Sequence, residues 1–523
     1  MRWIAQPELE RYEADVLPSW FAKTYEPHGS VSLRPDAAVT AAGTELLELD
    51  GEQLAIHPDS AAWAFVDERE AALLQATHAG RNGGATVADL VAQWSGAPDA
   101  IAAMWRRGLV AIDGRRAVDE RMFTDSANYV EGHLVELLIT EKCNLACGYC
   151  LAGANPSMPS MTPEIARRTI DLAFAMEEAG TIGFEFAGGE PFLKFKLLRE
   201  LVDYIERHPG AAGRQVFVNV QTNATLLDDE KVRWAAEHGV RVGVSIDGPR
   251  PAQDMSRPTI HGHGSYDQLI AGIDALQRHG VPFGGLVVLN RSNVGDVDGL
   301  IDFLIDNEIL HFRMNPVVYL GTARERWHEL GLEQHEVIDF FQAFLERVVA
   351  RGLPLLESNV AAMCDFLTSK QRKTRCMRSH CGAGDTFQSV AANGDIYPCG
   401  RSTQTPDWRL GNVLDDSVES LSAAGRHHPV LVQIRGRRPT SLDGCATCPY
   451  RELCQAGCSA TAYERYGTVR HRTPECAFYK TMYPHLMRRL TFDSAALAVL
   501  GANGYFPAGA VIVDTQLLSA GVA

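Results

Sequence analysis

The middle of the chain alternates short apolar runs with amphipathic helical segments, and this alternation constrains the fold more than any other feature of the sequence. Six runs read as strands, and the segments between them carry apolar residues at the helical period. Strands that alternate with helices form parallel sheets. We expect strands at 134–140, 182–187, 215–221, 240–246, 282–289 and 312–318, and helices at 163–179, 197–208, 228–237 and 266–278.

This pattern predicts an α/β fold, a partial (β/α)6 barrel of the TIM type over residues 130–355. A cysteine-free segment, 1–125, precedes it, a cysteine-rich and turn-rich segment, 356–490, follows it, and a tail, 491–523, ends the chain. Functional residues of parallel barrels lie where the strands end. The motifs that follow the first, second, third and fourth strands are therefore the first places to look for chemistry.

Composition and charge narrow the class of protein. The first 20 residues contain no signal peptide, so we expect a cytoplasmic protein in which the 12 cysteines bind metal instead of forming disulfides. The formal net charge of −16 argues against a nucleic-acid partner. The uncharged stretch 495–513 contains Asn503 and Pro507, so it reads as a tail and no membrane partner is expected.

Three cysteines follow the first expected strand as C-x3-C-x2-C: Cys143, Cys147 and Cys150, the cysteine triplet. Three thiolates on one loop can bind three iron atoms of a [4Fe–4S] cluster and leave the fourth iron open to a ligand from outside the protein. A structural zinc site would need a fourth Cys or His nearby, and none follows in the loop. The triplet therefore predicts a cluster with one open iron.

Eight more cysteines lie between 376 and 476, and Cys364 lies apart from them. Eight thiolates suit two four-cysteine clusters, and spacing alone does not separate iron–sulfur clusters from zinc sites. This segment shows little apolar periodicity, so we expect bound metal, and not a conventional core, to stabilise it. We interpret Cys364 as a buried structural thiol.

Further motifs follow the later strands: Gly188-Gly189-Glu190-Pro191, then the segments 221–225 and 245–249, then Arg257. Glycines allow a backbone to approach a ligand closely. Polar residues at strand ends can bind hydroxyl and carboxylate groups, although the same residue types also form ordinary caps and turns. From the residues alone, both interpretations stay open.

The triplet resembles the signature of the radical S-adenosylmethionine (SAM) superfamily, whose members use SAM on the open iron to generate a 5′-deoxyadenosyl radical. The GGEP, QTNAT and SIDGP segments and the later C-x2-C-x5-C-x3-C spacing are similar to those of members with a SPASM extension. The resemblance implies SAM and three [4Fe–4S] clusters as cofactors. It implies SAM contacts from Tyr149, Gly188, Gly189, Glu190, Gln221, Ser245 and Arg257, a first auxiliary cluster on Cys376, Cys381, Cys399 and Cys458, and a second on Cys445, Cys448, Cys454 and Cys476.

The N-terminal segment suggests a substrate class. Strand-like runs at 44–49 and 53–57 flank the turn dipeptide Asp50-Gly51, and helices are expected at 61–77, from Val87 onward and at 101–109, before a short apolar run at 109–112. This layout has the size of a small winged-helix module and resembles the winged-helix-like domain with which peptide-modifying enzymes bind a leader peptide by strand addition. A structural cap on the barrel is the alternative.

The resemblance leads us to expect a radical SAM oxidoreductase that modifies a ribosomally made precursor peptide, by a carbon–carbon cyclophane or thioether crosslink. Its expected partners are a leader-bearing precursor and an electron donor such as flavodoxin or ferredoxin. The alternatives are a peptide epimerase, a protein-maturing oxidase of the sulfatase-maturase or quinohaemoprotein type, and a non-catalytic electron carrier. Gly400-Arg401 stands where sulfatase maturases carry an Asp after the equivalent cysteine, which weakens that alternative. The residues identify no catalytic acid or base.

Overall fold

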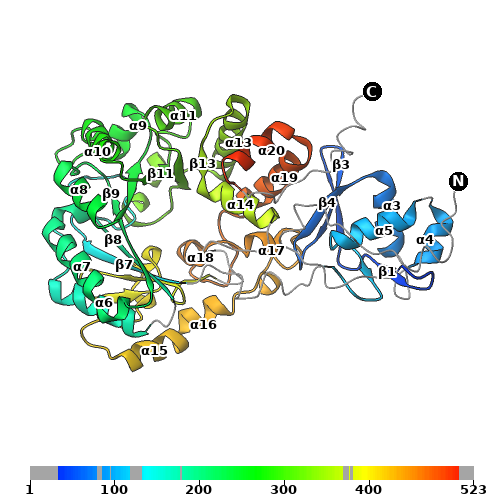
Figure 1. The fold of residues 1–523 in the computed structure, drawn as a ribbon, viewed down its shortest axis with the longest axis horizontal. Helices are drawn as coiled ribbons and strands as arrows, with labels where there is room; N and C mark the ends of the chain where they lie inside the picture. The colour runs from blue at the N-terminus through cyan, green and yellow to red at the C-terminus, as the bar shows by residue number, and fades with distance from the viewer. Residues whose placement is uncertain are drawn as a thin grey trace.

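The computed structural model describes residues 33–78, 85–94, 96–117, 132–176, 180–368, 376 and 381–505. Figure 1 shows the N-terminal elements at one end of the molecule, a large barrel-like sheet with its helices at the other end, and the C-terminal helices between them. Within the described ranges, no helix is both long and apolar enough to span a bilayer. The expectations for residues 1–32 and 506–523 lie outside the described residues.

The central sheet has ten strands in the order β13-β12-β11-β10-β9-β8-β7-β14-β15-β16. Every neighbouring pair from β13 to β14 is parallel, as the alternation of strands and helices predicts. The α/β partial-barrel prediction is therefore confirmed. The parallel strands from β7 onward are β7 (His133–Thr140), β8 (Thr181–Gly188), β9 (Gln215–Thr222), β10 (Arg241–Ile246), β11 (Phe283–Leu289), β12 (His311–Pro316) and β13 (Leu356–Glu357).

Helices cover one face of these strands, and burial alternates with the strand period of two. On β9, for example, Val218 and Val220 are buried, whereas Asn219 and Gln221 are half-buried on the opposite, concave face. The polar residues of the strands therefore gather on the concave face. The barrel helices are α6 (Pro163–Met176), α7 (Phe195–Arg207), α8 (Asp229–Glu237), α9 (Arg250–Ser256), α10 (Tyr266–Arg278), α11 (Val297–Asp306), α12 (Trp327–Leu330) and α13 (Gln334–Arg351).

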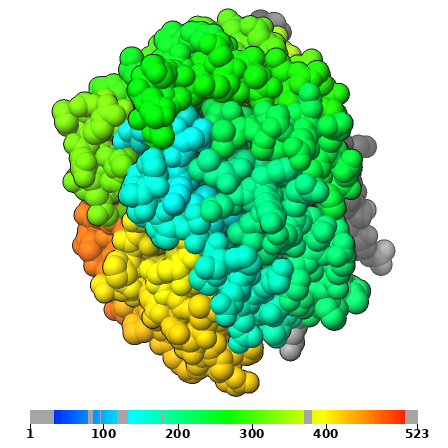
Figure 2. All heavy atoms as spheres, turned by 90° about the vertical axis from the view of Figure 1, so that its left-hand side faces the viewer, coloured from blue at the N-terminus to red at the C-terminus, as the bar shows by residue number. Residues whose placement is uncertain are grey.

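The C-terminal region extends the barrel sheet beyond β7. Strand β14 (Phe387–Val390) pairs parallel with β7, and β15 (Asp395–Tyr397) and β16 (Gly411–Asn412) continue the sheet antiparallel. Figure 2 shows the corresponding contact on the surface, where the yellow C-terminal segment lies against the cyan segment of the barrel. The sequence predicts six barrel strands but does not predict this extension.

The N-terminal part forms two small antiparallel sheets. One has the order β2-β3-β4, from β2 (Glu45–Leu49), β3 (Glu52–His57) and β4 (Ala62–Val66), and the other the order β5-β1-β6, from β1 (Ala38–Thr40), β5 (Ala85–Thr86) and β6 (Ala111–Ile112). The expected hairpin is confirmed: β2 pairs with β3, and the turn residues Asp50 and Gly51 have φ of 50° and 85°.

The helix expected at 61–77 is wrong in its first part. Residues Ala62–Val66 form β4 because Trp63 and Phe65 pair across from Ile56 and Leu54 of β3. The helix starts only after Asp67, whose carboxylate accepts a hydrogen bond from the Glu70 backbone N–H (2.8 Å). The helices here are α3 (Glu68–His78), α4 (Val87–Gln93), which Thr86 caps as expected, and α5 (Ala97–Arg106).

The sequence analysis expects no conventional hydrophobic core in the cysteine-rich segment, and this expectation is wrong. Side chains from its helices, such as Leu431, Met482 and Leu486, are fully buried in the same core as the barrel. The apolar residues come from many short elements, which hides their periodicity. The helices are α14 (Ser358–Thr368), α15 (Val418–His427), α16 (Pro429–Arg435), α17 (Arg451–Cys454), α18 (Ser459–Tyr466), α19 (Cys476–Phe492) and α20 (Ser494–Ala502), and α20 gives structure to the first part of the expected tail.

Candidate active site

The cysteine triplet lies on the loop that follows β7, at the carboxyl end of that strand. The chain after α9 fixes the loop through backbone hydrogen bonds, including Ala146 N–H to Pro258 O (2.7 Å) and Ile260 N–H to Asn144 O (3.1 Å). The loop is thus positioned by β7 on one side and by the segment after α9 on the other.

Burial raises the pKa of the Cys143 thiol to about 11 and that of the Cys147 thiol to about 12, and Cys150 adds to both shifts. Without a cation the two thiols are therefore protonated at neutral pH. Because only the thiolate binds metal, loading this loop with iron releases protons, and the metal supplies the charge that stabilises the thiolates.

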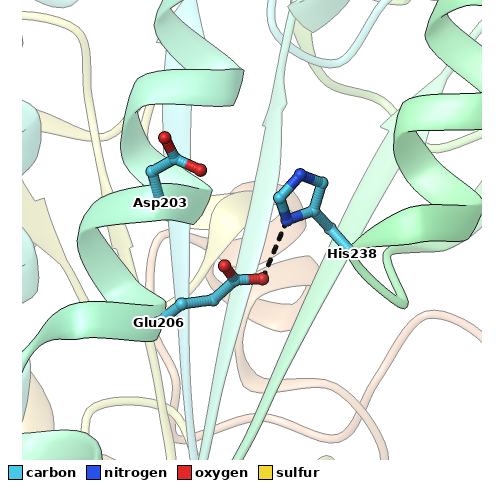
Figure 3. A group of neighbouring side chains, drawn as sticks. All are labelled: Asp203, Glu206 and His238. Atoms are coloured by element: carbon cyan, nitrogen blue, oxygen red, sulfur yellow. Dashed lines mark hydrogen bonds and ion pairs between the residues drawn. The ribbon is translucent and has the colours of Figure 1, made fainter.

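The spacing of the sulfur atoms bears on which metal fits. Among the described residues, which include all 12 cysteines, one group of three ligand atoms lies within 4.8 Å of one another: Asp203, Glu206 and His238. Figure 3 shows this group on the outer helices, where His238 Nδ1 lies 2.9 Å from Glu206 Oε1. No three cysteine sulfurs are that close, whereas a tetrahedral zinc site places its thiolates about 3.8 Å apart. Thiolates that bind different irons of one cluster lie further apart, so this spacing is compatible with a cluster.

Gly188 and Gly189 lie at the end of β8 against the start of the cysteine loop. A Cβ on Gly188 would lie 2.1 Å from Thr140 O, and one on Gly189 would lie 2.1 Å from Lys142 O. The Gly189 N–H instead donates to Thr140 O (2.7 Å). Only glycine permits this approach, so the two residues fix the cysteine loop relative to β8.

Glu190 is fully buried beside these glycines, and three protein donors bind its carboxylate. It accepts hydrogen bonds from Phe192 N–H (3.0 Å), the Thr222 hydroxyl (2.8 Å) and Asn223 N–H (2.8 Å). Burial raises its pKa to about 7. Its side chain therefore joins the ends of β8 and β9, and what this motif presents to a ligand is its backbone.

Tyr149 and Arg257 meet on Asp247, a residue of the SIDGP segment that the sequence analysis does not single out. The Tyr149 hydroxyl donates to Asp247 Oδ2, and Arg257 Nε lies 3.2 Å from the same oxygen. The guanidinium also lies over the Tyr149 ring, 5.3 Å from its centroid. Asp247 is fully buried, and burial raises its pKa. This buried group joins the cysteine loop to the end of β10 and to the residue after α9.

Gln221 and Ser245 lie side by side near the carboxyl ends of β9 and β10, on the concave face. The Gln221 amide donates to Ser245 Oγ (2.9 Å), and both side chains are half-buried, so both keep polar atoms open to a ligand. Together, the structure brings all the expected SAM contacts to the strand ends around the triplet. Gln221 and Ser245 face the open side, whereas Glu190 and Arg257 have protein partners.

The eight later cysteines fall into two groups of four. Burial holds the pKa of the Cys381 thiol well above its usual range, and the nearby thiols of Cys376, Cys458 and Cys399 add to this shift. These four residues form the first cysteine group. The chain brings them together from the start of the SPASM-like segment, from the loop after β15 and from the residue before α18.

The second cysteine group is Cys445, Cys448, Cys454 and Cys476, which line one cavity. Arg451, Arg472 and Lys480 line the same cavity. A bound cluster with four thiolates is an anion, and these cations offset its charge. The cavity, the donor set and the surrounding charge fit an iron–sulfur cluster.

Two further residues complete the picture. Cys364 is fully buried in the core on α14, apart from the cysteine groups, as expected of a structural thiol. Glu136, which the sequence analysis missed, lies on the concave face of β7 with Oε2 2.5 Å from where a Cβ on Gly400 would lie. Burial and the neighbouring Glu185 raise its pKa to about 7. A single acidic residue in a strand gives no local signal of this environment.

Comparisons with known proteins agree with this geometry. Residues 137–304 match the radical SAM superfamily, and residues 381–449 match the SPASM iron–sulfur cluster-binding domain. An uncharacterized protein of Archaeoglobus fulgidus is 27% identical over 66% of this chain and 78% of its own length. The serine-type anaerobic sulfatase-maturating enzyme of Klebsiella aerogenes is 25% identical over 63% of this chain and 80% of its own.

Solved structures share the fold. The anSMEcpe structure with bound AdoMet superposes with a TM-score of 0.62 at 18% identity, over 70% of this chain and all of the other. Streptococcus suis SuiB bound to the precursor peptide SuiA gives a TM-score of 0.50 at 14% identity, over 85% of this chain and 99% of the other.

The barrel, the cysteine loop and the family match define the class: residues 137–304 form a radical SAM domain, and the chain is an enzyme. It carries, in addition, a SPASM domain that follows the barrel in the sequence. Its relatives include anaerobic sulfatase-maturating enzymes. The family resemblance inferred from the sequence is thereby confirmed. The two domains imply SAM and iron–sulfur clusters as cofactors.

Proposed function

We propose that this enzyme cleaves SAM at a [4Fe–4S] cluster bound by the cysteine triplet and uses the radical to crosslink side chains of a ribosomally made precursor peptide. The observation that carries the proposal is the division of eleven cysteines into one open set of three and two complete sets of four. A set of three leaves one iron for SAM, and sets of four hold clusters that pass electrons. The enzyme would thus carry three [4Fe–4S] clusters.

The SAM contacts proposed are Tyr149, the backbone of Gly188, Gly189 and Glu190, and the side chains of Gln221, Ser245 and Arg257. Gln221 and Ser245 support this assignment because their polar atoms face the concave side beside the triplet. In this proposal Glu190 and Arg257 act chiefly through their buried partners, which hold the loops that surround the ligand.

A crosslink suits the two auxiliary clusters. Joining two side chains removes two hydrogens: the 5′-deoxyadenosyl radical takes one as an atom, and the other leaves as a proton and an electron. The electron needs an acceptor, which an auxiliary cluster provides. An external donor such as flavodoxin or ferredoxin would reduce the SAM cluster in each cycle.

The N-terminal part supports a peptide substrate. Strands β2 and β4 each have one strand neighbour among the described residues, so each has an edge to which an extended peptide can add. The same sheet packs against the SPASM side of the molecule, where Arg451 Nε donates to Asp59 Oδ1 (2.9 Å). Arg451 also lines the cavity of the second cysteine group. A leader bound at this sheet would therefore lie close to the auxiliary centres.

The test uses the anaerobically reconstituted full chain with SAM, a reductant and a short peptide encoded beside its gene. We expect 5′-deoxyadenosine and a peptide lighter by two hydrogens, and iron analysis should find about 12 iron atoms per chain. An unchanged peptide mass with altered stereochemistry would make the enzyme an epimerase. Absence of 5′-deoxyadenosine from fully loaded protein would disprove radical chemistry, and zinc in place of iron would indicate a scaffold. The expected cytoplasmic location belongs to this proposal, and cell fractionation tests it.

The second candidate is a protein-maturing oxidase, which the sulfatase-maturating relatives favour. The structure weighs against the sulfatase version at one position. Gly400 replaces the Asp of those enzymes, and the Glu136 carboxylate already occupies the space that a side chain there would enter. Capture of a large folded partner, and not a short peptide, would favour this candidate.

A further inference from the structure

Arg437 follows α16 and is buried, with 6% of its surface exposed. All its donor nitrogens bind backbone carbonyls. Nε donates to Val469 O (2.8 Å), Nη1 to Gly457 O (2.9 Å), and Nη2 to Ala456 O and His471 O (both 2.8 Å). No carboxylate in the described part of the chain forms an ion pair with it. A guanidinium with its donors satisfied but no carboxylate beside it is unusual inside a protein.

The carbonyls that Arg437 binds lie on the two stretches of chain that connect the cysteine groups. Residues 455–457 separate Cys454 of the second group from Cys458 of the first. Residues 469–471 lead from α18, which follows Cys458, toward Cys476 of the second group. One side chain thus fixes both connections, and movement of either group relative to the other would break its hydrogen bonds.

The charge of Arg437 also acts on both groups. Burial lowers its pKa, and the thiols of Cys458, Cys381, Cys445 and Cys454 oppose that effect. Two of these thiols belong to each group. Arg401 differs: the thiols that act on it, Cys458, Cys376 and Cys399, belong to the first group, and Glu475 offsets its charge. A buried cation is costly without a counter-charge, and anionic clusters bound by the two cysteine groups would supply one for Arg437.

We infer that Arg437 is a positioning residue that holds the two auxiliary clusters at a fixed separation and stabilises the reduced state of both. This inference rests on the proposed function for the two clusters. Each [4Fe–4S] cluster accepts one electron and becomes more negative, with no bond formed or broken, so a nearby fixed cation favours the reduced form. A cation that acts on both clusters keeps their reduction potentials similar, and similar potentials allow one electron to pass between the clusters.

The experiment measures the midpoint potentials of the auxiliary clusters by EPR-monitored titration of the full chain. Replacing all three triplet cysteines by Ala in every sample leaves the auxiliary signals alone. Arg437→Gln removes the charge, Arg437→Lys keeps it with fewer donors, and Arg438→Gln changes the exposed neighbour as the matched control. Iron and sulfide are counted in each sample, so no substrate is needed.

We expect Arg437→Gln to lower the equilibrium constant for reduction of each cluster at least tenfold, which lowers its midpoint potential by about 59 mV for a one-electron couple. Arg437→Lys and Arg438→Gln should stay within about twofold of the parent, or about 18 mV. Unchanged potentials in fully loaded Arg437→Gln, or a shift of one cluster only, would overturn the inference.

If Arg437→Gln does not hold its iron, the iron count and Arg437→Lys decide. Loss that affects both clusters equally, with both potentials retained in Arg437→Lys, supports the link, whereas loss from one cluster only overturns it. Failure of the proposed function is visible separately. The parent chain would then bind fewer than about 8 iron atoms outside the triplet before any Arg437 variant is compared.

Discussion

The barrel site and the SPASM region hold cysteines in opposite ways. At the barrel, three cysteines lie within eight residues, and side chains that follow β8 and β10 form hydrogen bonds that the protein itself completes, such as those of Glu190 and Asp247. In the SPASM region, eight cysteines come from 101 residues of chain, and Arg451, Arg472 and Lys480 line the cavity of the second group. The barrel site is therefore preformed, whereas the SPASM sites depend on what they bind.

The largest expected effect comes from removing a cysteine of the triplet at the barrel site. Cys147→Ala removes one of the three ligands of the SAM cluster, so 5′-deoxyadenosine formation should fall by more than about 1000-fold and iron by about a third. Liquid chromatography with iron analysis measures both. Cys364→Ala is the control, since it removes a buried thiol outside the three sets and should keep all the iron. Near-normal 5′-deoxyadenosine from Cys147→Ala would disprove the assignment.

The second prediction concerns the removal of a cysteine from the SPASM region. Cys454→Ala opens the cavity of the second group, so iron should again fall by about a third and modified peptide by at least about tenfold. Formation of 5′-deoxyadenosine should continue, because the triplet is untouched. The ratio of 5′-deoxyadenosine to product measures this uncoupling. If 5′-deoxyadenosine and modified peptide fell by the same factor, the barrel site and the SPASM region would not be separate functional units.

The third prediction tests whether the barrel site is preformed without its ligand. Asp247→Asn leaves Arg257 buried without its counter-charge, which should cost about 3–5 kcal/mol in the free energy of unfolding. Denaturant titration of the metal-free chain measures it. Asp267→Asn, which removes an exposed partner of Arg250, should leave the stability unchanged. Equal effects of the two variants would show that the buried ion pair does not hold the site together.

The smallest effect lies where the two regions meet, at Glu136 beside Gly400. Its pKa is raised to about 7 in the folded chain, from 4.5, by burial and by Glu185. Below about pH 4.5 both states hold the proton. Between about pH 4.5 and pH 7 the unfolded state has released it while the folded state keeps it, so the stability falls over this range and levels off above pH 7. Glu136→Gln should remove about 2 kcal/mol of this decline between pH 5 and pH 8.

Thermal unfolding of the parent and the Glu136→Gln variant at the two pH values tests this sign. The exposed Glu164→Gln variant should retain the full decline of the parent. A larger decline in Glu136→Gln than in the parent would contradict the raised pKa.

The sequence predicts what depends on local periodicity and spacing. The strands at 182–187 and 215–221 and the helix at 266–278 agree with the structure because their apolar residues repeat along the chain. The strand Ala62–Val66 was missed because its apolar run is continuous with that of α3, and only pairing with β3 separates the two. The Asp67-x-x-Glu70 cap was the available signal.

The residues missed at the site share a different cause. Arg437 acts through carbonyls about 20 to 34 positions further along the chain, which have no side-chain signature. Asp247 lies inside a quoted motif, but its role depends on Tyr149, 98 positions earlier. Such residues become visible only when the chain brings distant segments together.

The pairing of β14 with β7 has a consequence for how the enzyme can be divided. The strand that leads into the cysteine triplet has β8 on one side and β14 of the C-terminal region on the other. A barrel cut free of residues 381–505 would leave the backbone groups of that strand unpaired along one side, beside the loop that carries the cysteine triplet. The barrel and the SPASM domain thus share one sheet. Replacing the SPASM domain by another domain would require a new strand to pair with β7 beside the cysteine triplet.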